Sequence, residues 1–366
     1  MFRAKFKHTD WPIGLDVGDH SVRLLQLSTR GGSLRAVAAA AEPLREGLQH
    51  RGSDYHPAVK AAIAAALSRG GFTGHAVVSA LPASAVQCKN LRLPPMPADE
   101  LAAAVRWEAN DRFRLGEGKG VVQHLDAGRV QQGDEHKQEL IMLAAELGFV
   151  EAHVAALTDN GLRPRAIDSV PTALARIATR WVDDESQAAV VIDLGQSATK
   201  VLVVRGGLVR FYKPIDIGLA HLDAAASGVL RLPLTEARDR RLDASSGSLD
   251  AQDAARLAEA LAPKLGELGR EIGLCLRYYG VTFRGPRPGR ALAIGGGASA
   301  WLAGLLAEPV GIELVVDNPL GHIDFGGVRE VVWPGSESAW SVAAGLSMRD
   351  HAAASAKPAS GAKEAA

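Results

Sequence analysis

Residues 188–204 read AAVVIDLGQSATKVLVV, two apolar runs separated by a short turn that begins with Asp193-x-Gly195. An apolar run of this length that is bounded by turn residues predicts a buried strand, so the segment predicts strand, tight turn, strand. Residues 13–27, IGLDVGDHSVRLLQL, have the same organisation around a second Asp-x-Gly. The chain therefore contains one kind of strand–turn–strand unit twice.

The two units are related by a constant offset. The shift along the chain that aligns Asp16 with Asp193 also aligns Arg23 with Lys200, and apolar positions align with apolar positions on both sides. This period is too long for a solenoid, which repeats every roughly 20–50 residues. The sequence therefore predicts a duplicated domain, in which each half begins with an Asp-x-Gly unit.

The repeated turn has a chemistry suited to polyphosphates. Glycine has no Cβ, so a ligand can approach the backbone closely, and the amides of the turn can point at one anion. A carboxylate repels bare phosphate, but it can hold the water ligands of a Mg²⁺ ion that bridges phosphates. One such turn is most often only a turn, whereas two in equivalent positions predict a cleft that holds a polyphosphate from both sides. The candidate hydroxyl donors are Ser21, Ser197 and Thr199.

A glycine triplet, Gly295–Gly297, lies between an apolar strand and a predicted helix. Its backbone can lie flat against a base or ribose, and the following helix presents its N-terminus toward phosphate. Alone, such a triplet is usually a loop. It becomes informative because it follows the two Asp-x-Gly units in the chain.

The composition excludes several classes of protein. The 366 residues carry 41 Lys plus Arg and 41 Asp plus Glu, so a generally basic nucleic-acid binder is excluded. The two cysteines are far apart and the histidines are scattered, which excludes a zinc-type site and a disulfide framework. No signal peptide or stretch of about 18 apolar residues is present. These features predict a soluble, cytosolic protein.

Some local features give weaker expectations. Residues 251–279 predict a long helix interrupted at Pro263, and the helix after the glycine triplet is expected to end at Pro309. The arginines of segment 238–241 are interpreted as an exposed, charged helix end or loop. Trp107 and Trp301 are interpreted as core or subdomain-packing residues rather than ligand stackers, and Cys88 and Cys275 as buried and inert thiols.

The order of three motifs resembles the actin, Hsp70 and sugar-kinase superfamily. The motifs are GLDVG at 14–18, VIDLG at 191–195 and IGGG at 294–297, similar to the superfamily's first phosphate, second phosphate and adenosine motifs. The resemblance implies ATP and Mg²⁺ as cofactors, with Asp16 and Asp193 as the catalytic and metal-associated carboxylates. The cofactor-binding residues that it implies are Gly18, Ser21, Gly195, Gln196, Ser197, Thr199, Arg270, Glu271, Gly295, Gly296 and Gly297. For Arg270 and Glu271, a solvated pair on a helix is the alternative.

Within this superfamily the chain resembles the PilM family, cytoplasmic actin-like proteins of type IV pilus assembly that are related to FtsA. The resemblance extends over about residues 13–348 and includes WEA at 107–109, NGLRP at 160–164 and VVDNP at 315–319. It implies an α/β fold of duplicated actin-like (ribonuclease-H-like) domains around a nucleotide cleft, with an inserted FtsA-like subdomain. The implied divisions are 1–178 with an insertion at about 80–160, 179–350 with a last helix that returns to the first half, and a disordered tail at 351–366.

The same resemblance implies partners and a location. In PilM proteins a groove beside the inserted subdomain binds the N-terminal cytoplasmic tail of the inner-membrane protein PilN, and other pilus inner-membrane and motor components are implied. The chain is then cytoplasmic, associated peripherally with the inner membrane through its partner, without membrane insertion of its own and without nucleic acid. The resemblance assigns no individual groove residues.

Two departures from the superfamily pattern predict weak catalysis. Val170 stands where many members have an acidic residue that positions the attacking water, and Asp168, two positions earlier, is the candidate substitute. Asp19 adds negative charge next to the phosphate site, which weakens nucleotide binding unless Mg²⁺ or His20 compensates. We therefore expect ATP to bind and to be hydrolysed slowly or not at all.

Three other functions remain open. A sugar or small-molecule kinase of the same fold needs a separate substrate-binding pattern, which is not recognisable here. A filament-forming relative of FtsA normally ends in an amphipathic membrane helix, whereas residues 352–366 have no apolar stripe. The cytoplasmic part of the secretion protein GspL continues into a membrane span, which this sequence lacks.

Overall fold

The computed structural model describes residues 10–350 except 31–32, 46, 51, 114, 116–117, 180, 182–186, 286–287 and 329–335. The basic segment 1–9, Gly31-Gly32 and the tail expected to be disordered, 351–366, lie outside the described residues.

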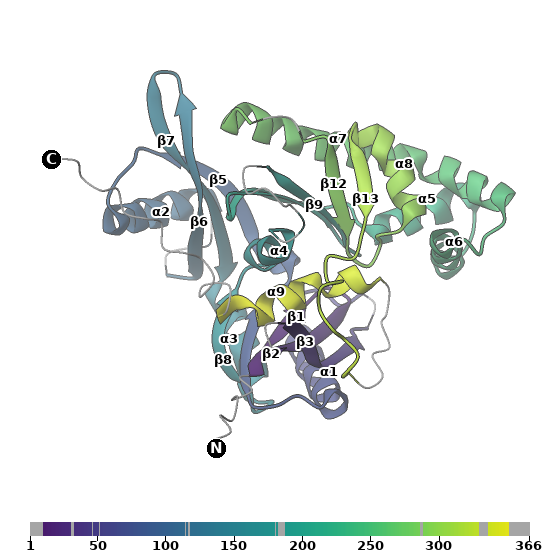
Figure 1. The fold of residues 1–366 in the computed structure, drawn as a ribbon, viewed down its shortest axis with the longest axis horizontal. Coiled ribbons are helices and arrows are strands. Elements are labelled where there is room, and N and C mark those ends of the chain that lie inside the picture. Colours follow the sequence, from purple (N-terminus) through teal and green to yellow (C-terminus); the bar gives the residue numbers. More distant parts are fainter. Residues whose placement is uncertain are drawn as a thin grey trace, which may run out of the picture.

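Two five-stranded sheets carry the two Asp-x-Gly turns (Figure 1). The first contains β1 (Asp10–Val17), β2 (Ser21–Arg30), β3 (Ser33–Pro43), β4 (Ala76–Ala80) and β8 (Arg163–Asp168). The second contains β9 (Ala189–Leu194), β10 (Thr199–Arg205), β11 (Leu208–Ile215), β12 (Arg290–Ile294) and β13 (Glu313–Val316). Their strand orders, β3-β2-β1-β4-β8 and β11-β10-β9-β12-β13, are equivalent strand by strand. The predicted fold class is confirmed.

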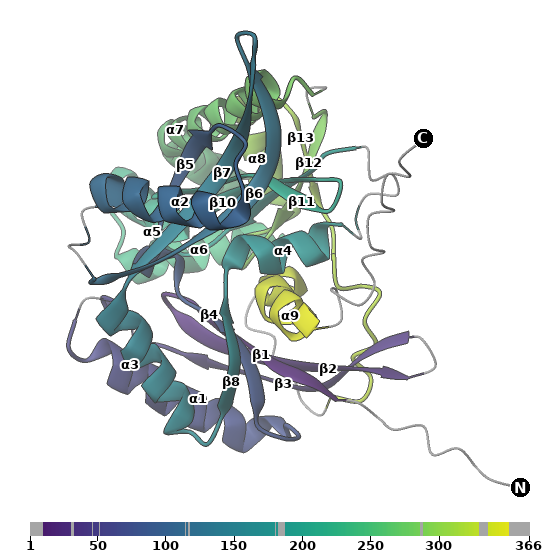
Figure 2. The same ribbon diagram turned by 90° about the vertical axis from the view of Figure 1, so that its left-hand side faces the viewer.

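Helices cover both faces of each sheet (Figures 1 and 2). The outer face of the first sheet packs against α1 (Tyr55–Gly70) and α3 (Leu147–Thr158). The outer face of the second packs against α5 (Leu219–Leu230), α7 (Ala251–Phe283) and α8 (Ala300–Val310). Two helices, α4 (Val170–Ala178) and α9 (Ser341–Ser347), lie between the sheets. This double coverage explains why every residue of β9 is buried and why its sequence is almost continuously apolar.

The packing of α9 on β1 depends on Gly14. An added Cβ at this residue would lie 2.0 Å from the Ala343 carbonyl oxygen and 2.6 Å from the Ser347 amide nitrogen. Both of these atoms belong to the backbone of α9, so no side-chain movement relieves the clash. The glycine of the first phosphate-like motif therefore allows a helix of the second half of the chain to lie directly on the first sheet.

We expect Gly14→Ala to lower the free energy of unfolding by about 1–3 kcal/mol, the usual cost of overpacking a core. The measurement is thermal or urea denaturation followed by circular dichroism. The matched control is Gly228→Ala on α5, where an added Cβ has no neighbour within 4 Å and the helix gains propensity. Equal transition midpoints for the two variants would contradict this interpretation of the β1–α9 contact.

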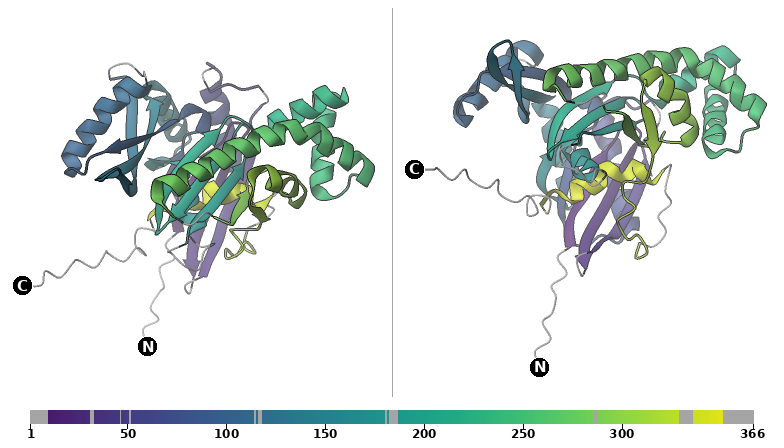
Figure 3. Two further views of the ribbon diagram at one scale, coloured as in Figure 1. Left: turned by 90° about the horizontal axis from the view of Figure 1, so that it is seen from above. Right: turned by 45° about the horizontal axis from the view of Figure 1, so that its top comes forward.

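A third sheet, of order β5-β7-β6, forms an inserted subdomain with α2 (Ala98–Phe113). Its strands are β5 (Gln87–Leu93), β6 (Gly120–Gln132) and β7 (Glu135–Glu146). The short 3-10 turn η1 (Ala83–Ala85) links it to β4 in the first half. The sheet also contacts the second half, since β6 lies beside β11 and the C-terminal part of α7 (Figure 3). The subdomain thus packs against both halves.

Both prolines expected to break helices lie inside them, so these expectations are wrong. Pro263 is within the 33-residue α7, and Pro309 is within α8, which ends at Val310 before the left-handed Gly311. The apolar face of α7 remains buried on both sides of Pro263, and this packing outweighs the lost hydrogen bond. Pro309 packs directly on Gly269 of α7, where the two helices cross closely.

The structure also corrects expectations about single side chains. Trp107 on α2 is 71% exposed and is therefore not a core residue, whereas Trp301 is half-buried against the hydrophobic core of the second half. Arg241 lies within the helix α6 (Leu234–Ser246) and is buried. Burial raises the pKa of the Cys275 thiol to about 11 and that of the half-buried Cys88 to about 12, so both thiols are protonated and unreactive at neutral pH.

Candidate functional site

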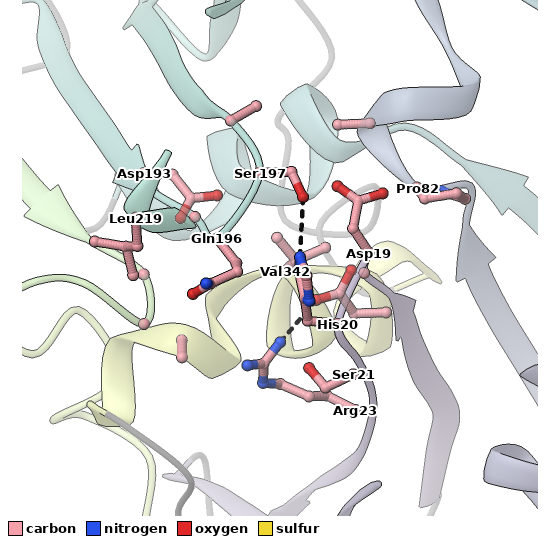
Figure 4. A pocket seen from close by; sticks show the side chains of 18 of the residues that line it. Asp19, His20, Ser21, Arg23, Pro82, Asp193, Gln196, Ser197, Leu219 and Val342 are labelled. Atoms are coloured by element: carbon pink, nitrogen blue, oxygen red, sulfur yellow. Dashed lines mark hydrogen bonds and ion pairs between the residues drawn. The ribbon is translucent and has the colours of Figure 1, made fainter. Parts of the chain in front are cut away.

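A cleft of about 450 Å³ opens between the two five-stranded sheets (Figure 4). Two of its walls are the β1–β2 turn, residues 16–21, and the β9–β10 turn, Asp193 with residues 195–198. A third part is formed by Gly295 and Gly296 after β12, and by side chains of α6. The topology therefore brings together three motifs that lie far apart in the sequence.

Each Asp-x-Gly carboxylate is paired with a cation on the neighbouring strand. Asp193 lies opposite Lys200, with 2.8 Å between Oδ2 and Nζ, and Asp16 lies opposite Arg23, with 4.0 Å between Oδ2 and Nη1. These are the pairs that the constant offset between the two halves relates. The two sides of the cleft therefore carry the same arrangement of charges, tight in the second half and loose in the first.

Burial and neighbouring charges have different net effects on the ionised forms of Asp16 and Lys200. Burial raises the pKa of Asp16, and the positive charges of Arg23 and Lys200 offset this only in part. For Lys200, burial disfavours the ammonium, but the Asp193 carboxylate and the charges of Asp16 and Asp19 outweigh it, so its pKa is raised. Lys200 is therefore held in its charged form, whereas the ionised form of Asp16 would be stabilised by a further cation.

The residues of the cleft fit a polyphosphate with Mg²⁺. Within the described residues, Nε of Arg23 is buried without a hydrogen-bond partner, and Arg23 lines the cleft, so a donor is available for an anion. The incompletely compensated Asp16 and its counterpart Asp193 are oxygen ligands of the kind that hold Mg²⁺ directly or through water. Donors for phosphate and carboxylates for a hard cation thus line one cavity.

The two turns contact each other across the cleft. Nε2 of His20 lies 3.1 Å from Oγ of Ser197 (Figure 4). The offset that relates the two Asp-x-Gly units also aligns these two positions, so the contact is made by equivalent residues of the two halves. His20 therefore joins the two halves where the two Asp-x-Gly turns face each other across the cleft.

Most of the cofactor-binding residues expected from the sequence are brought together. The ones that line the cleft, besides Asp16 and Asp193, are Gly18, Ser21, Gly195, Gln196, Ser197, Gly295 and Gly296. Gly295 has φ +95° and lies so close to Asp193 that an added Cβ would be 2.3 Å from its carboxylate. A glycine is therefore required here by the backbone conformation and by the neighbouring carboxylate.

Four of the expected residues do not line the cleft. The Thr199 hydroxyl is buried and donates to the Ile217 carbonyl at 2.7 Å, so it braces the loop before α5. Gly297 packs against Leu219, whose side chain an added Cβ would strike. Arg270 and Glu271 lie on α7 away from the cleft, and Glu271 pairs with Lys213 at 3.0 Å.

Side chains of α6 line the cleft, whereas Arg270 and Glu271 of α7 do not. The α6 side chains are those of Arg238, Arg241 and Leu242. Arg241 is buried and forms a bidentate ion pair with Asp223 of α5, with 3.1 Å between Nη2 and Oδ2. The arginine cluster was visible in the sequence, but its acidic partner lies on another helix and gave no local signal.

Asp168, the candidate for positioning water, is engaged elsewhere. Its carboxylate contacts Arg176 at 2.8 Å and Arg349 at 3.3 Å, and accepts a hydrogen bond from the Thr172 hydroxyl at 2.6 Å. Burial alone would raise the pKa of Asp168, but Arg176 and the hydrogen bonds outweigh burial and lower it. The residues of α4 that line the cleft are the apolar Val170 and Leu174.

A second cavity, of about 490 Å³, forms a groove between the inserted subdomain and the first half. Its walls are mainly apolar side chains of β6, β7 and β8, with polar groups at Gln123, His124 and the Asp168–Arg349 pair. Leu81, Ala83 and Val170 line both this groove and the cleft. These three residues therefore form a wall that separates the two cavities.

Comparisons with known proteins agree with this architecture. A family model described as type IV pilus assembly protein PilM matches residues 14–351. A chain of a PilM-PilN type IV pilus biogenesis complex is similar at 24% identity and TM-score 0.76, over 92% of this chain and 98% of that chain. The ethanolamine utilization protein EutJ from Carboxydothermus hydrogenoformans is similar at 13% identity and TM-score 0.55, over 93% and 89%. MreB 5 of Spiroplasma citri bound to AMPPNP is similar at 11% identity and TM-score 0.51, over 93% and 96%.

Proposed function

Because this chain belongs to the PilM family of type IV pilus assembly proteins, we propose that it is a nucleotide-binding scaffold of pilus assembly. In this proposal the cleft binds ATP with Mg²⁺. The groove binds the N-terminal cytoplasmic tail of a PilN-like inner-membrane protein. The observation that supports it most strongly is the presence of both cavities, back to back, in one chain of this family.

The charges of the cleft support the nucleotide part of the proposal. Lys200 and Arg23 donate to phosphate oxygens, and the glycines of the two turns and of Gly295–Gly296 let the ligand approach the backbone. Asp16 and Asp193 hold Mg²⁺, which neutralises part of the phosphate charge when bound. The similarity to MreB 5, whose structure contains AMPPNP, agrees with this assignment.

We propose further that hydrolysis is slow. The side of the cleft near α4 presents Val170, and Asp168 is held by two arginines outside the cleft, so neither orients an attacking water. Positioning of that water matters greatly for hydrolysis and little for binding. Mg²⁺-dependent turnover that Asp193→Ala abolishes would overturn this part.

The groove supports the partner part of the proposal. Apolar walls with a few polar groups suit a short extended peptide with apolar side chains. The similarity to a chain from a PilM-PilN complex agrees with this occupant. We also propose that other inner-membrane and motor components of the pilus machinery contact this protein, and that nucleic acid does not.

The proposed location follows from the partner. No helix in the described ranges is both long and apolar enough to cross a bilayer. We propose that the protein lies on the cytoplasmic side of the inner membrane, held there through the PilN-like tail. The net charge of zero agrees with attachment through a protein rather than through anionic lipids.

The groove assignment predicts the effect of a charge placed in its wall. Val121→Glu on β6 is expected to weaken binding of a PilN-type tail peptide by at least about tenfold, because it buries a charge against an apolar partner. The measurement is fluorescence polarisation with a labelled synthetic peptide that has the sequence of a PilN N-terminal cytoplasmic tail. Val229→Glu, at a 62% exposed site on α5, is the matched control and should bind like the wild type. Equal affinity of the two variants, or no binding of any such peptide, would reject this groove as the partner site.

A further inference from the structure

The wall between the two cavities includes residues 81–86, the chain connection from β4 to the inserted subdomain, which we call the hinge. The residues that line both cavities include Leu81 and Ala83, which connect β4 to the subdomain through η1. A peptide in the groove would therefore rest on the segment that forms one side of the cleft. This geometry connects the two sites through a few consecutive residues.

Ser84 in this hinge is bonded to the first phosphate-like turn. Its hydroxyl donates to Oδ1 of Asp19, which belongs to the β1–β2 turn and lines the cleft. In Figure 4 the Asp19 carboxylate lies on the Pro82 side of His20, away from Arg23. The side chain of one hinge residue thus holds the negative charge of the turn at the edge of the cleft next to the subdomain.

The position of this charge matters for any anion in the cleft. Asp19 is close enough to act electrostatically on both Asp16 and Lys200. If its carboxylate turned inward, it would compete with phosphate for Lys200 and repel the phosphate oxygens directly. Its present position at the hinge reduces both effects.

We propose that Ser84 is a positioning residue that holds the Asp19 carboxylate away from the phosphates, and that nucleotide affinity therefore depends on whether the partner groove is occupied. The proposal rests on the proposed function, since it takes ATP and a PilN-type tail as the two ligands. By linkage, a tail that fixes the hinge changes ATP affinity by the same factor as ATP changes tail affinity.

The test is a double-mutant cycle on Mg·ATP affinity by calorimetry. We expect Ser84→Ala to weaken binding about threefold to tenfold, the scale of one ordinary intramolecular hydrogen bond, because Ser84 acts on the ligand only through Asp19. Asp19→Asn should tighten binding, because it removes the repulsion. The double variant should bind like Asp19→Asn alone, since without the charge Ser84 has nothing to position. Ser68→Ala on α1, whose exposed hydroxyl donates to the Ala65 carbonyl of the same helix, is the matched control.

The second measurement adds the tail peptide. In the wild type the peptide should change ATP affinity by about fivefold or more, and in Ser84→Ala this factor should fall close to one. Equal ATP affinities of Ser84→Ala and Ser68→Ala would overturn the inference. The inference would also be overturned if Ser84→Ala lowered ATP affinity by the same factor in the Asp19→Asn background as in the wild type. Ser84 would then contact the nucleotide itself. Failure of the wild type to bind ATP at all would overturn the nucleotide proposal, and a tail that binds without affecting ATP would overturn the coupling alone.

Discussion

Lys200→Met should weaken the binding of Mg·ATP by at least about 100-fold, the scale expected when one partner of a buried charge pair is removed. Lys200 is a buried cation that lines the cleft and lies 2.8 Å from Asp193. Methionine has a similar length without the charge, so the variant removes the donor for phosphate while filling the same space. It also leaves the Asp193 carboxylate unpaired, which adds repulsion toward the ligand.

The control for this variant is Lys213→Met on β11. Lys213 is half-exposed and pairs with Glu271, and neither residue lines the cleft. Binding is measured by calorimetry on both variants, together with thermal denaturation, because an unpaired buried carboxylate also destabilises the fold. The cleft assignment is wrong if Lys200→Met remains folded and binds Mg·ATP like Lys213→Met.

The two turns of the cleft were predictable from the sequence because their signals are local. A buried strand reads as an apolar run, Asp-x-Gly marks its end, and the offset between Asp16 and Asp193 shows that the two turns are equivalent. The equal topology of the sheets follows from this duplication. Gly295 was also predictable, because the triplet Gly295–Gly297 follows an apolar run and precedes a predicted helix.

The remaining features depend on contacts between distant parts of the chain. A charged arginine cluster such as 238–241 is usually exposed, so Arg241 was expected to be exposed. Its burial depends on Asp223, which lies on another helix and cannot be identified from the local sequence. The helix α7 continues through Pro263 because the second core covers one of its faces, which local propensity does not reveal. The hydrogen bond between Ser84 and Asp19 joins two loops that are far apart in the sequence, since β2, β3, α1 and β4 lie between them. Sequence patterns therefore located the two Asp-x-Gly turns of the cleft but neither its α6 side nor its link to the groove.

The second large effect concerns the attachment of the inserted subdomain to the second half. Glu139 on β7 has no exposed surface, and its carboxylate accepts hydrogen bonds from Arg92 at 2.5 Å, Asn90 at 2.9 Å and Tyr278 at 2.6 Å. Arg92 also donates to Thr282 at 2.9 Å. Tyr278 and Thr282 belong to α7, so one buried carboxylate joins the subdomain to the second half.

Glu139→Ala is therefore expected to lower the free energy of unfolding by about 3–5 kcal/mol, the cost of leaving a buried charge partner uncompensated. The uncompensated group is the guanidinium of Arg92, whose pKa the hydrogen bond to Glu139 raises and which is only about one-third exposed. Glu139→Gln, which keeps the shape but not the charge, should cost less. Denaturation gives the total effect, and hydrogen exchange of β5, β6 and β7 shows whether the subdomain loosens before the rest of the chain unfolds.

The control is Glu135→Ala on the same strand, where an exposed carboxylate pairs with Lys137 and solvent screening leaves such a pair little effect on stability. If both alanine variants unfold at the same midpoint, the Glu139 cluster does not join the subdomain to α7. A large loss of protection from hydrogen exchange that is confined to β5, β6 and β7 would show that this cluster holds the subdomain. Since the partner groove lies between that sheet and the first half, the same variant should then also bind the tail peptide more weakly.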